Sequence, residues 1–319
     1  MSGLPVPPGG ISCIAFNAGR ANKAVECRRP VASLDRMATA PAQFSYRWIP
    51  AVLLIGAVLA RAATVEAGST STTAAAWREL AAGNSREARA SFLKVRASQP
   101  TAIRETQIGE AVALLNLQPV TATNREAARR LCAEVATANP EDAWTLKARY
   151  FLGRISELHT TPTDLAGAAT HYEWLFTHHP ASEWGQLALV KFAIVQLQEP
   201  VAPDETHRRY HRLVTLEPKL AEASARRDFH LVLGATCLQH DLGLEEALRH
   251  LLAAEAAGVR QPIRAATVLI QIAELSRKLG RLVQARTYYE RFLAVAGDGD
   301  TRSFLVRERL AAWPVEVKP

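Results

Sequence analysis

Histidine is the residue type in this sequence whose spacing most suggests chemistry. All nine histidines lie between residues 159 and 250, and His207 and His211 are four residues apart. On a helix this spacing can place two imidazoles on one metal ion. No third ligand follows at a convincing spacing, and the two arginines between these histidines would oppose a cation. The pattern therefore favours a solvated helix face, and we expect no metal site and no cofactor.

An enzyme built on these histidines is the alternative. A metal-dependent hydrolase would need two or three of His171, His207, His211 and His230 to converge in one pocket. Residues 297–300 resemble the start of a calcium loop, but the acidic residues that such a loop needs further along are missing. The nucleophile-elbow, zinc-protease, phosphate-loop and Cys-x-x-Cys motifs are also absent from the sequence. We therefore do not expect catalysis.

The positive charge of the chain is concentrated near its start. The formal net charge is +7, but residues 1–62 contain seven Lys or Arg and only two Asp or Glu, so the remainder is nearly neutral. A nearly neutral body gives no electrostatic footprint for nucleic acid. We therefore expect no nucleic-acid partner.

Residues 48–60 form a charge-free apolar run. The run is shorter than the roughly 20 apolar residues of a membrane-spanning helix and is typical of the hydrophobic region of a signal peptide. Arg47 precedes it, and Ala60-Arg61-Ala62 offers a small-x-small cleavage site, which would make Ala63 the first mature residue. The sequence predicts export to the periplasm. The alternative is an uncleaved inner-membrane anchor, so membrane contact is expected only through this segment.

The rest of the chain repeats with a period of about 40 residues. A small residue is followed four positions later by a larger side chain, and in four units a proline follows eight positions after that. We expect the small residue where two helices approach closely, the larger one on the same helix face, and the proline at the helix end. The small residues are Ala88, Ala128, Ala168, Thr206, Ala247 and Ala285, the larger ones Phe92, Cys132, Tyr172, Tyr210, Leu251 and Tyr289, and the prolines Pro100, Pro140, Pro180 and Pro218.

The pattern Ala-x3-aromatic-x7-Pro resembles the second helix and closing turn of a tetratricopeptide repeat. Leu152-Gly153, Leu233-Gly234 and Leu279-Gly280 resemble the Leu-Gly pair of the first helix in that family. The family repeats every 34 residues or so, and this chain departs from it with a longer period. The resemblance implies an all-α fold, an α-solenoid of about six helical hairpins.

The repeats and the leader together predict the domain organisation. Residues 1–62 are the leader, residues 63–75 a flexible tether, residues 76–313 the solenoid and residues 314–319 a tail. Within the solenoid, residues 301–313 are expected to form a helix that caps the open end, as terminal repeats require.

Three smaller features have structural interpretations. Residues 159–164 are expected to form an enlarged loop that ends with Asp164 as a helix N-cap. Cys132 and Cys237 are too far apart in the repeat array for a disulfide and are expected to be free, buried thiols. The apolar side chains of Phe304 and Leu305 offer an alternative to capping, in which the chain associates with itself through its open end.

The family fold implies a binding surface. In such solenoids the first helices line a concave face that binds an extended peptide or a helix. By the repeat register, the side chains expected there combine both charges with a few aromatics, which suits a protein ligand. They are Lys147, Tyr150, Arg154 and Glu157 in the third hairpin and Ile270, Glu274 and Arg277 in the last.

One segment resembles a particular group within the tetratricopeptide family. Tyr172-x2-Leu175-x4-Pro180-x-Ser182-x2-Gly185 is similar to a signature of envelope tetratricopeptide proteins of the Tol-Pal-associated and outer-membrane-assembly types. The resemblance implies that the partners are other envelope proteins. The sequence thus predicts a non-catalytic protein–protein interaction scaffold of the cell envelope, and the alternative is an envelope enzyme with a histidine-based metal site.

Overall fold

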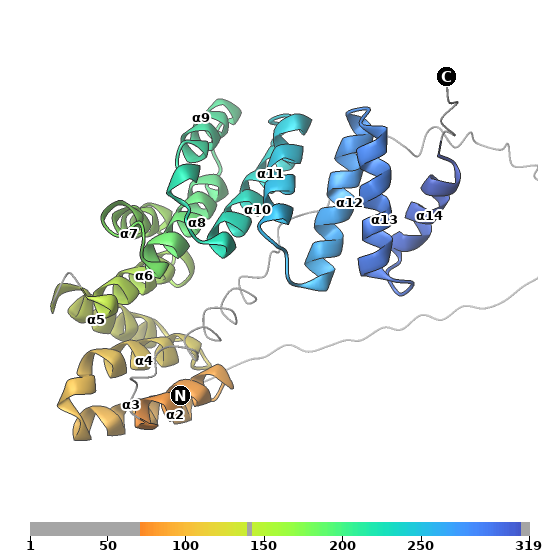
Figure 1. The fold of residues 1–319 in the computed structure, drawn as a ribbon. Helices are drawn as coiled ribbons and strands as arrows, with labels where there is room; N and C mark the ends of the chain where they lie inside the picture. Colours follow the sequence, from red (N-terminus) through yellow and green to blue (C-terminus); the bar gives the residue numbers. More distant parts are fainter. Residues whose placement is uncertain (1–70, 139–141, 314–319) are drawn as a thin grey trace, which may run out of the picture. The chain divides into compact units, whose positions relative to one another are not determined.

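The computed structural model describes residues 71–138 and 142–313, and this part of the chain contains helices and no strand (Figure 1). The predicted leader, its apolar run at 48–60, most of the tether and the tail lie outside the described residues. The helices are α2 (Ser71–Ala81), α3 (Ser85–Ser98), α4 (Ile103–Asn116), α5 (Ala122–Ala138), α6 (Ala143–Leu158), α7 (Leu165–His178), α8 (Glu183–Gln198), α9 (Pro203–Val214), α10 (Ala223–Gln239), α11 (Leu244–Ala256), α12 (Pro262–Lys278), α13 (Leu282–Ala296) and α14 (Arg302–Ala311), with short 3-10 helices η3 (Pro100–Ala102) and η4 (Glu217–Lys219).

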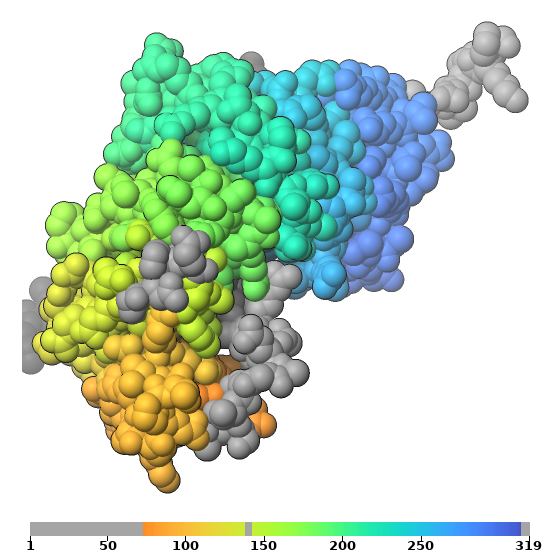
Figure 2. All heavy atoms as spheres, turned by 60° about the vertical axis from the view of Figure 1, so that its left-hand side comes forward, coloured from red at the N-terminus to blue at the C-terminus, as the bar shows by residue number. Residues whose placement is uncertain are grey.

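The helices pack in the order of the sequence, each against the next, except that α9 has few contacts or none with α10. They form six hairpins, α2/α3, α4/α5, α6/α7, α8/α9, α10/α11 and α12/α13, followed by α14. Most second helices also pack on the first helix of the following hairpin. Figure 2 shows that side chains fill the spaces that the ribbon leaves between neighbouring hairpins. The expected all-α solenoid of about six hairpins is therefore confirmed.

The repeat columns form the interior. All six small residues, from Ala88 to Ala285, are buried, and so are the six larger residues that follow them by one helical turn. The first helices come so close to these residues that glycine is required at some contacts. A Cβ atom on Gly153 would lie 2.6 Å from the ring of Tyr172, in the second helix of the same hairpin. One period of about 40 residues therefore corresponds to one helical hairpin, and the recurring residues are those that pack in its interior.

Two boundaries differ from the expectation. Helix α2 begins at Ser71, so that five residues of the predicted tether are helical, because Thr73 and Ala76 are buried and alanine favours a helix. Gly280 does not correspond to Gly153 and Gly234. It lies after the end of α12 with φ +72°, where glycine ends the helix, so the interpretation of Leu279-Gly280 as a first-helix pair was wrong.

The predicted capping helix is present. α14 packs on α13 and buries Ser303 and Val306, and the Ser303 hydroxyl donates to the Gly297 carbonyl at 2.7 Å. Phe304 and Leu305 remain 67% and 46% exposed on the outer side of this helix. Self-association through that surface stays a prediction.

The remaining expectations concern loops, thiols and membranes. The Asp164 carboxylate accepts the Gly167 amide at 2.8 Å, as an N-cap does, and Cys132 and Cys237 are free and buried. Both predictions are confirmed. Within 71–138 and 142–313, no helix combines the length and the apolar character that crossing a bilayer would require.

Candidate partner-binding surface

The first helices of the hairpins touch one another in a row. α2 contacts α4, α4 contacts α6, α6 contacts α8 and α8 contacts α10, whereas α12 packs mainly on α11 and α13. A surface formed by this row therefore draws side chains from up to five hairpins. The candidate site is the middle of the row, at α6 and its neighbours.

Three tryptophans from three hairpins surround one lysine in this row. The Lys147 ammonium of α6 lies 4.4 Å from the ring centroid of Trp77 in α2, 5.1 Å from Trp144 in α6 and 5.8 Å from Trp184 in α8. Trp77 is buried and donates its indole N–H to Glu105 at 2.9 Å, whereas Trp144 and Trp184 are half-buried. We call Trp77, Trp144 and Trp184 the tryptophan cluster. The cluster holds the Lys147 ammonium against aromatic rings and leaves the indoles of Trp144 and Trp184 partly accessible.

A buried ionic network lies further along α6. The Glu157 carboxylate contacts Arg154 at 3.3 Å, Lys191 of α8 at 3.2 Å and the Tyr172 hydroxyl of α7 at 2.7 Å. All three charged side chains are at most 10% exposed. One carboxylate therefore balances two cations in the interior, and it joins the third hairpin to the fourth.

Burial governs the protonation of this network. Burial, with the nearby Arg154 charge, lowers the pKa of Lys191 to about 8 even though Glu157 opposes the shift. Burial also raises the pKa of Tyr150 to about 12 and that of Tyr172 well above its ordinary value, and the Glu157 charge acts in the same direction. Both phenols therefore stay protonated, and the Tyr172 hydroxyl serves as a donor to Glu157.

The structure corrects the expected exposure of the third-hairpin residues. Lys147, Tyr150, Arg154 and Glu157 are 5%, 2%, 8% and 6% exposed, so they are buried rather than presented on an open surface. Large aromatic side chains, Trp184 among them, pack directly over this face of α6. A role for these four residues in holding a partner stays a prediction.

The predicted residues of the last hairpin support the capping helix. Glu274 accepts the Tyr289 hydroxyl at 2.6 Å, pairs with Arg277 at 3.3 Å and forms an ion pair with Arg309 of α14. Ile270 is half-buried against the cluster formed by α12, α13 and α14, and Arg277 is exposed. Of these three residues, Arg277 offers most of its side chain to a partner, and binding there stays a prediction.

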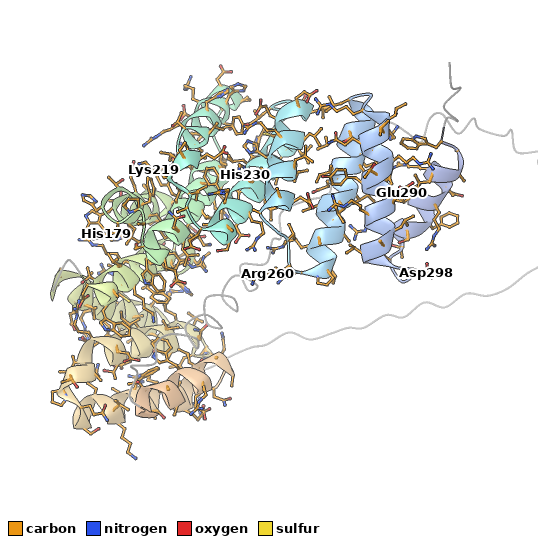
Figure 3. The ribbon with its side chains drawn as sticks, viewed as in Figure 1. His179, Lys219, His230, Arg260, Glu290 and Asp298 are labelled. Carbon is orange, nitrogen blue, oxygen red and sulfur yellow. The ribbon has the colours of Figure 1, made fainter. Side chains whose placement is uncertain are left out.

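The histidines of the hydrolase alternative lie in different surroundings. His207 and His211 lie side by side on the exposed face of α9, with ring centroids 4.6 Å apart. His230 lies between helices in the interior, where its partner is His250 at 2.9 Å (Figure 3). Among the described residues, no three His, Cys, Asp or Glu side chains are placed to hold a metal ion. Two of the four histidines that the hydrolase alternative names therefore lie together, but on an exposed helix face, and the buried His230 pairs with His250 instead.

The sequence interpretation missed the tryptophan cluster and Lys191. A signal for part of it was available, because Trp144 and Trp184 are 40 residues apart and so occupy the same position in consecutive repeats. Trp77 and Lys191 have no such relation, and only the contact between first helices brings them to the site.

The segment that resembled an envelope signature runs from α7, which holds Tyr172 and Leu175, through the turn into α8. The Ser182 hydroxyl accepts the Gly185 amide at 2.9 Å and caps α8, and a Cβ atom on Gly185 would lie 2.0 Å from the His179 carbonyl oxygen. The Gln186 side-chain amide donates to the carbonyl of Lys219 in η4, between α9 and α10, at 2.8 Å. Ser182 and Gly185 are thus required by a tight turn and its cap.

Comparisons with known proteins give weak structural similarities. No family model matches the chain, and no curated protein matches it significantly. Similar solved structures include the APC/C hetero-tetramer Cut9–Hcn1, with a TM-score of 0.44 and 16% identity over 81% of this chain. A tetratricopeptide repeat protein from Parabacteroides merdae has a TM-score of 0.38 and 14% identity, over 83% of this chain and 86% of its own.

The chain spans 45% of the length of the first of these structures. The similarities are too weak to support a functional argument. The packing of the helices themselves defines the class: the described chain is an all-α solenoid of helical hairpins with a terminal capping helix.

Proposed function

We propose that this chain is a non-catalytic scaffold of the tetratricopeptide type that binds a partner protein along the row of first helices. The observation that carries the proposal is the tryptophan cluster, which gathers aromatic side chains from three hairpins around Lys147. Tryptophan and tyrosine are enriched among the residues that dominate the energy of protein interfaces. Two indoles that are half-buried on a rigid helix row can dock a partner at little entropic cost.

The charge distribution supports a protein as the ligand. Most exposed arginines of the described hairpins are paired with carboxylates, as in Arg208–Glu205, Arg249–Glu246 and Arg286–Glu290. Such a surface lacks the unpaired basic stripe of a nucleic-acid-binding protein. We expect a peptide or helix with apolar anchors that occupy the space over Trp144 and Trp184.

The test compares tryptophans of the first helices with a tryptophan of a second helix. Tagged full chain is used to purify partners from the native cells, in wild-type form and as the Trp144→Ala/Trp184→Ala double variant. We expect the double variant to lose partner binding at least about tenfold, because interface tryptophans typically contribute 2 kcal/mol or more. Thermal unfolding of each variant establishes that the fold is kept.

Trp174→Ala is the matched control. Trp174 is a half-buried tryptophan of a second helix, α7, where the Arg149 guanidinium lies 3.8 Å from its ring centroid and His178 stacks on it. We expect this variant to bind partners as wild type does. Equal partner capture by the double variant and wild type would contradict the proposed surface.

We propose further that the chain works in the cell envelope, as an exported periplasmic protein or one held at the inner membrane by residues 48–60. The apolar run at 48–60 and the cleavage site before Ala63 support this assignment. Membrane fractionation with intact-mass measurement tests it. A soluble exported species that begins at Ala63 indicates a cleaved signal peptide, full-length chain in the membrane indicates an anchor, and full-length chain in the cytoplasm contradicts export.

A further inference from the structure

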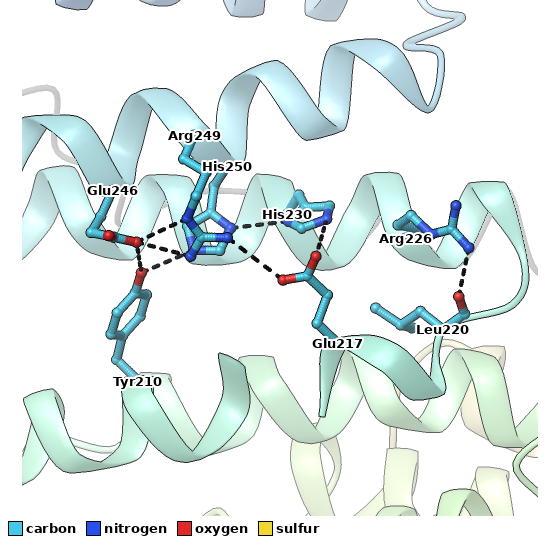
Figure 4. A network of polar contacts seen from close by, with 8 residues as sticks. All are labelled: Tyr210, Glu217, Leu220, Arg226, His230, Glu246, Arg249 and His250. Carbon is cyan, nitrogen blue, oxygen red and sulfur yellow. Dashed lines mark hydrogen bonds and ion pairs between the residues drawn. The ribbon is translucent and has the colours of Figure 1, made fainter. Parts of the chain in front are cut away.

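A buried polar network ties the fourth hairpin to the fifth (Figure 4). His230 of α10 and His250 of α11 are 1% and 0% exposed, and their Nδ1 atoms are 2.9 Å apart. His250 Nε2 lies 2.9 Å from the Tyr210 hydroxyl of α9, and His230 Nε2 lies 3.5 Å from Glu217 of η4. The network therefore crosses from α9 and η4 to α10 and α11.

The geometry assigns the protons. The Arg249 guanidinium can only donate, and its Nη2 lies 3.0 Å from His250 Nε2, so Nε2 is an acceptor. The proton of a neutral His250 is then on Nδ1, which donates to His230 Nδ1. The proton of a neutral His230 is consequently on Nε2 and faces the Glu217 carboxylate. Every imidazole nitrogen thus has one role, and no lone pair is left for another proton. The Tyr210 hydroxyl, 2.9 Å from His250 Nε2 and 3.0 Å from Glu246, gives its single proton to one of these two acceptors.

We propose that this histidine pair is a pH-sensitive junction, which is tight when both imidazoles are neutral and loosens when one takes up a proton. A proton added to His230 Nδ1 meets the N–H of His250. The shared hydrogen bond must reverse, which moves the His250 proton to Nε2 and directs it at the Arg249 guanidinium. Protonation of His250 at Nε2 produces the same conflict directly. Either event breaks at least one contact between α10 and α11.

Burial opposes protonation of the pair, and the charged groups around it act in both directions. Glu217 faces His230 and favours its protonation, whereas Arg226 on α10 and Arg249 on α11 disfavour it. Glu246 favours protonation of His250, but its carboxylate already accepts the Arg249 guanidinium. Tyr210 and Cys237 are buried beside the network and stay uncharged, because burial raises the pKa of both. Burial and the cationic neighbours lower the pKa of His230 and bring that of His250 to about 3.

The sign of the effect follows from these shifts. An unfolded histidine takes up a proton below about pH 6.5, while the folded pair resists it. The contribution to stability is therefore complete above pH 6.5 and is lost as the pH falls from there toward the folded pKa values. The junction is sensitive to this loss because α9 packs only sparsely on α8, so that Tyr210 depends on its partners in α11.

The first test reads the protons directly. Long-range 1H–15N spectra of the histidine rings are recorded on the full chain between pH 7.5 and 5.0. We expect the Nδ1–H tautomer for His250, the Nε2–H tautomer for His230, and neutral rings for both at pH 6. The opposite tautomers, or a proton taken up by either ring with a midpoint at about pH 6.5, would overturn the proposal.

The second test measures the loosening. Amide hydrogen exchange of the full chain, corrected for the intrinsic rates, is compared at pH 7.5 and 5.5. We expect protection in α10 and α11 to fall about tenfold, the factor for one histidine that is protonated only in the open state, with less than about threefold change in α2 and α3. His250→Gln is expected to abolish this difference, and His207→Gln, at an exposed histidine of α9, to keep it. A uniform change along the chain, or an unchanged difference in His250→Gln, contradicts the junction.

Discussion

Glu157 Oε1 lies 3.2 Å from the Lys191 ammonium, and both side chains are buried between α6 and α8. The same carboxylate faces Arg154 and accepts the Tyr172 hydroxyl, so three helices share one negative charge. A buried charge is tolerated only when it is paired and hydrogen-bonded. The contact between the third and fourth hairpins therefore combines apolar packing with a buried carboxylate that lies outside the repeat columns.

Removal of that charge should destabilise the protein strongly. Glu157→Gln keeps an oxygen acceptor for Tyr172 but leaves Arg154 and Lys191 as two buried, uncompensated cations. We expect a loss of about 3–5 kcal/mol in the free energy of unfolding, measured by urea denaturation. The control is Glu290→Gln at the exposed Arg286–Glu290 pair, where about 0.5 kcal/mol or less is expected. Equal losses in the two variants would mean that the buried network contributes nothing special.

The buried lysine should give an unusual alkaline pH dependence. The pKa of Lys191 is about 8 in the folded state, below its unfolded value of about 10.4. Between these values the unfolded state binds the extra proton, so this residue makes stability rise with pH, by up to about 1.4 kcal/mol per pH unit.

Urea denaturation of wild type and Lys191→Met at pH 7, 8, 9 and 10 isolates the effect. We expect the stability of wild type relative to the variant to increase over this range. A constant difference would show that Lys191 keeps its proton in the folded protein throughout.

The close approach of helices in the third hairpin should make Gly153 irreplaceable. A Cβ atom there would lie 2.6 Å from the Tyr172 ring, which cannot retreat because its hydroxyl is held by Glu157. Overpacking of about 1–3 kcal/mol exceeds the gain of up to about 1 kcal/mol in helix propensity, so Gly153→Ala should lower the melting temperature. At Gly299 nothing lies within 4 Å of an added Cβ, and Gly299→Ala should leave the melting temperature unchanged or slightly raised.

The fold was predictable because the positions that recur in each repeat are those at which helix packing requires a small or an apolar residue. Ala88, Ala168 and Ala285 are fully buried, and so are Phe92, Tyr172 and Tyr289 one helical turn further on. Each hairpin repeats the same local packing problem, so the periodicity of one sequence is sufficient to reveal it. The start of α2 was less predictable, because the alanine-rich segment before Trp77 reads equally as a tether or a helix.

The sequence predicted which helix carries the candidate site, but it did not predict that the side chains of Arg154 and Glu157 are buried. Register alone placed Arg154 and Glu157 on the exposed face of a first helix, whereas Trp184 and Lys191 of α8 cover that face. The burial comes from a neighbouring hairpin, and no periodicity within α6 encodes it. The pairing of His230 with His250 is hidden for the same reason, because it depends on the rotation of α10 against α11.

The two body cysteines provide a test of local opening. Cys132 in α5 and Cys237 in α10 are free and buried, and burial raises the pKa of the Cys132 thiol to about 12. Because the thiolate is the reactive form, both should react with a thiol reagent only when their helices open. The Cys13→Ser/Cys27→Ser background removes the other two cysteines of the chain. In this background we expect the two thiols to react at pH 7.5 roughly a hundredfold or more slowly than in about 8 M urea, in which small domains are unfolded. The chromogenic release of thionitrobenzoate gives the rate.

The variants Cys132→Ser and Cys237→Ser, each with one of the two thiols left, assign the rate to a single thiol. Fast reaction of Cys237 alone would place an opening in the fifth hairpin, and fast reaction of Cys132 alone would place one in the second.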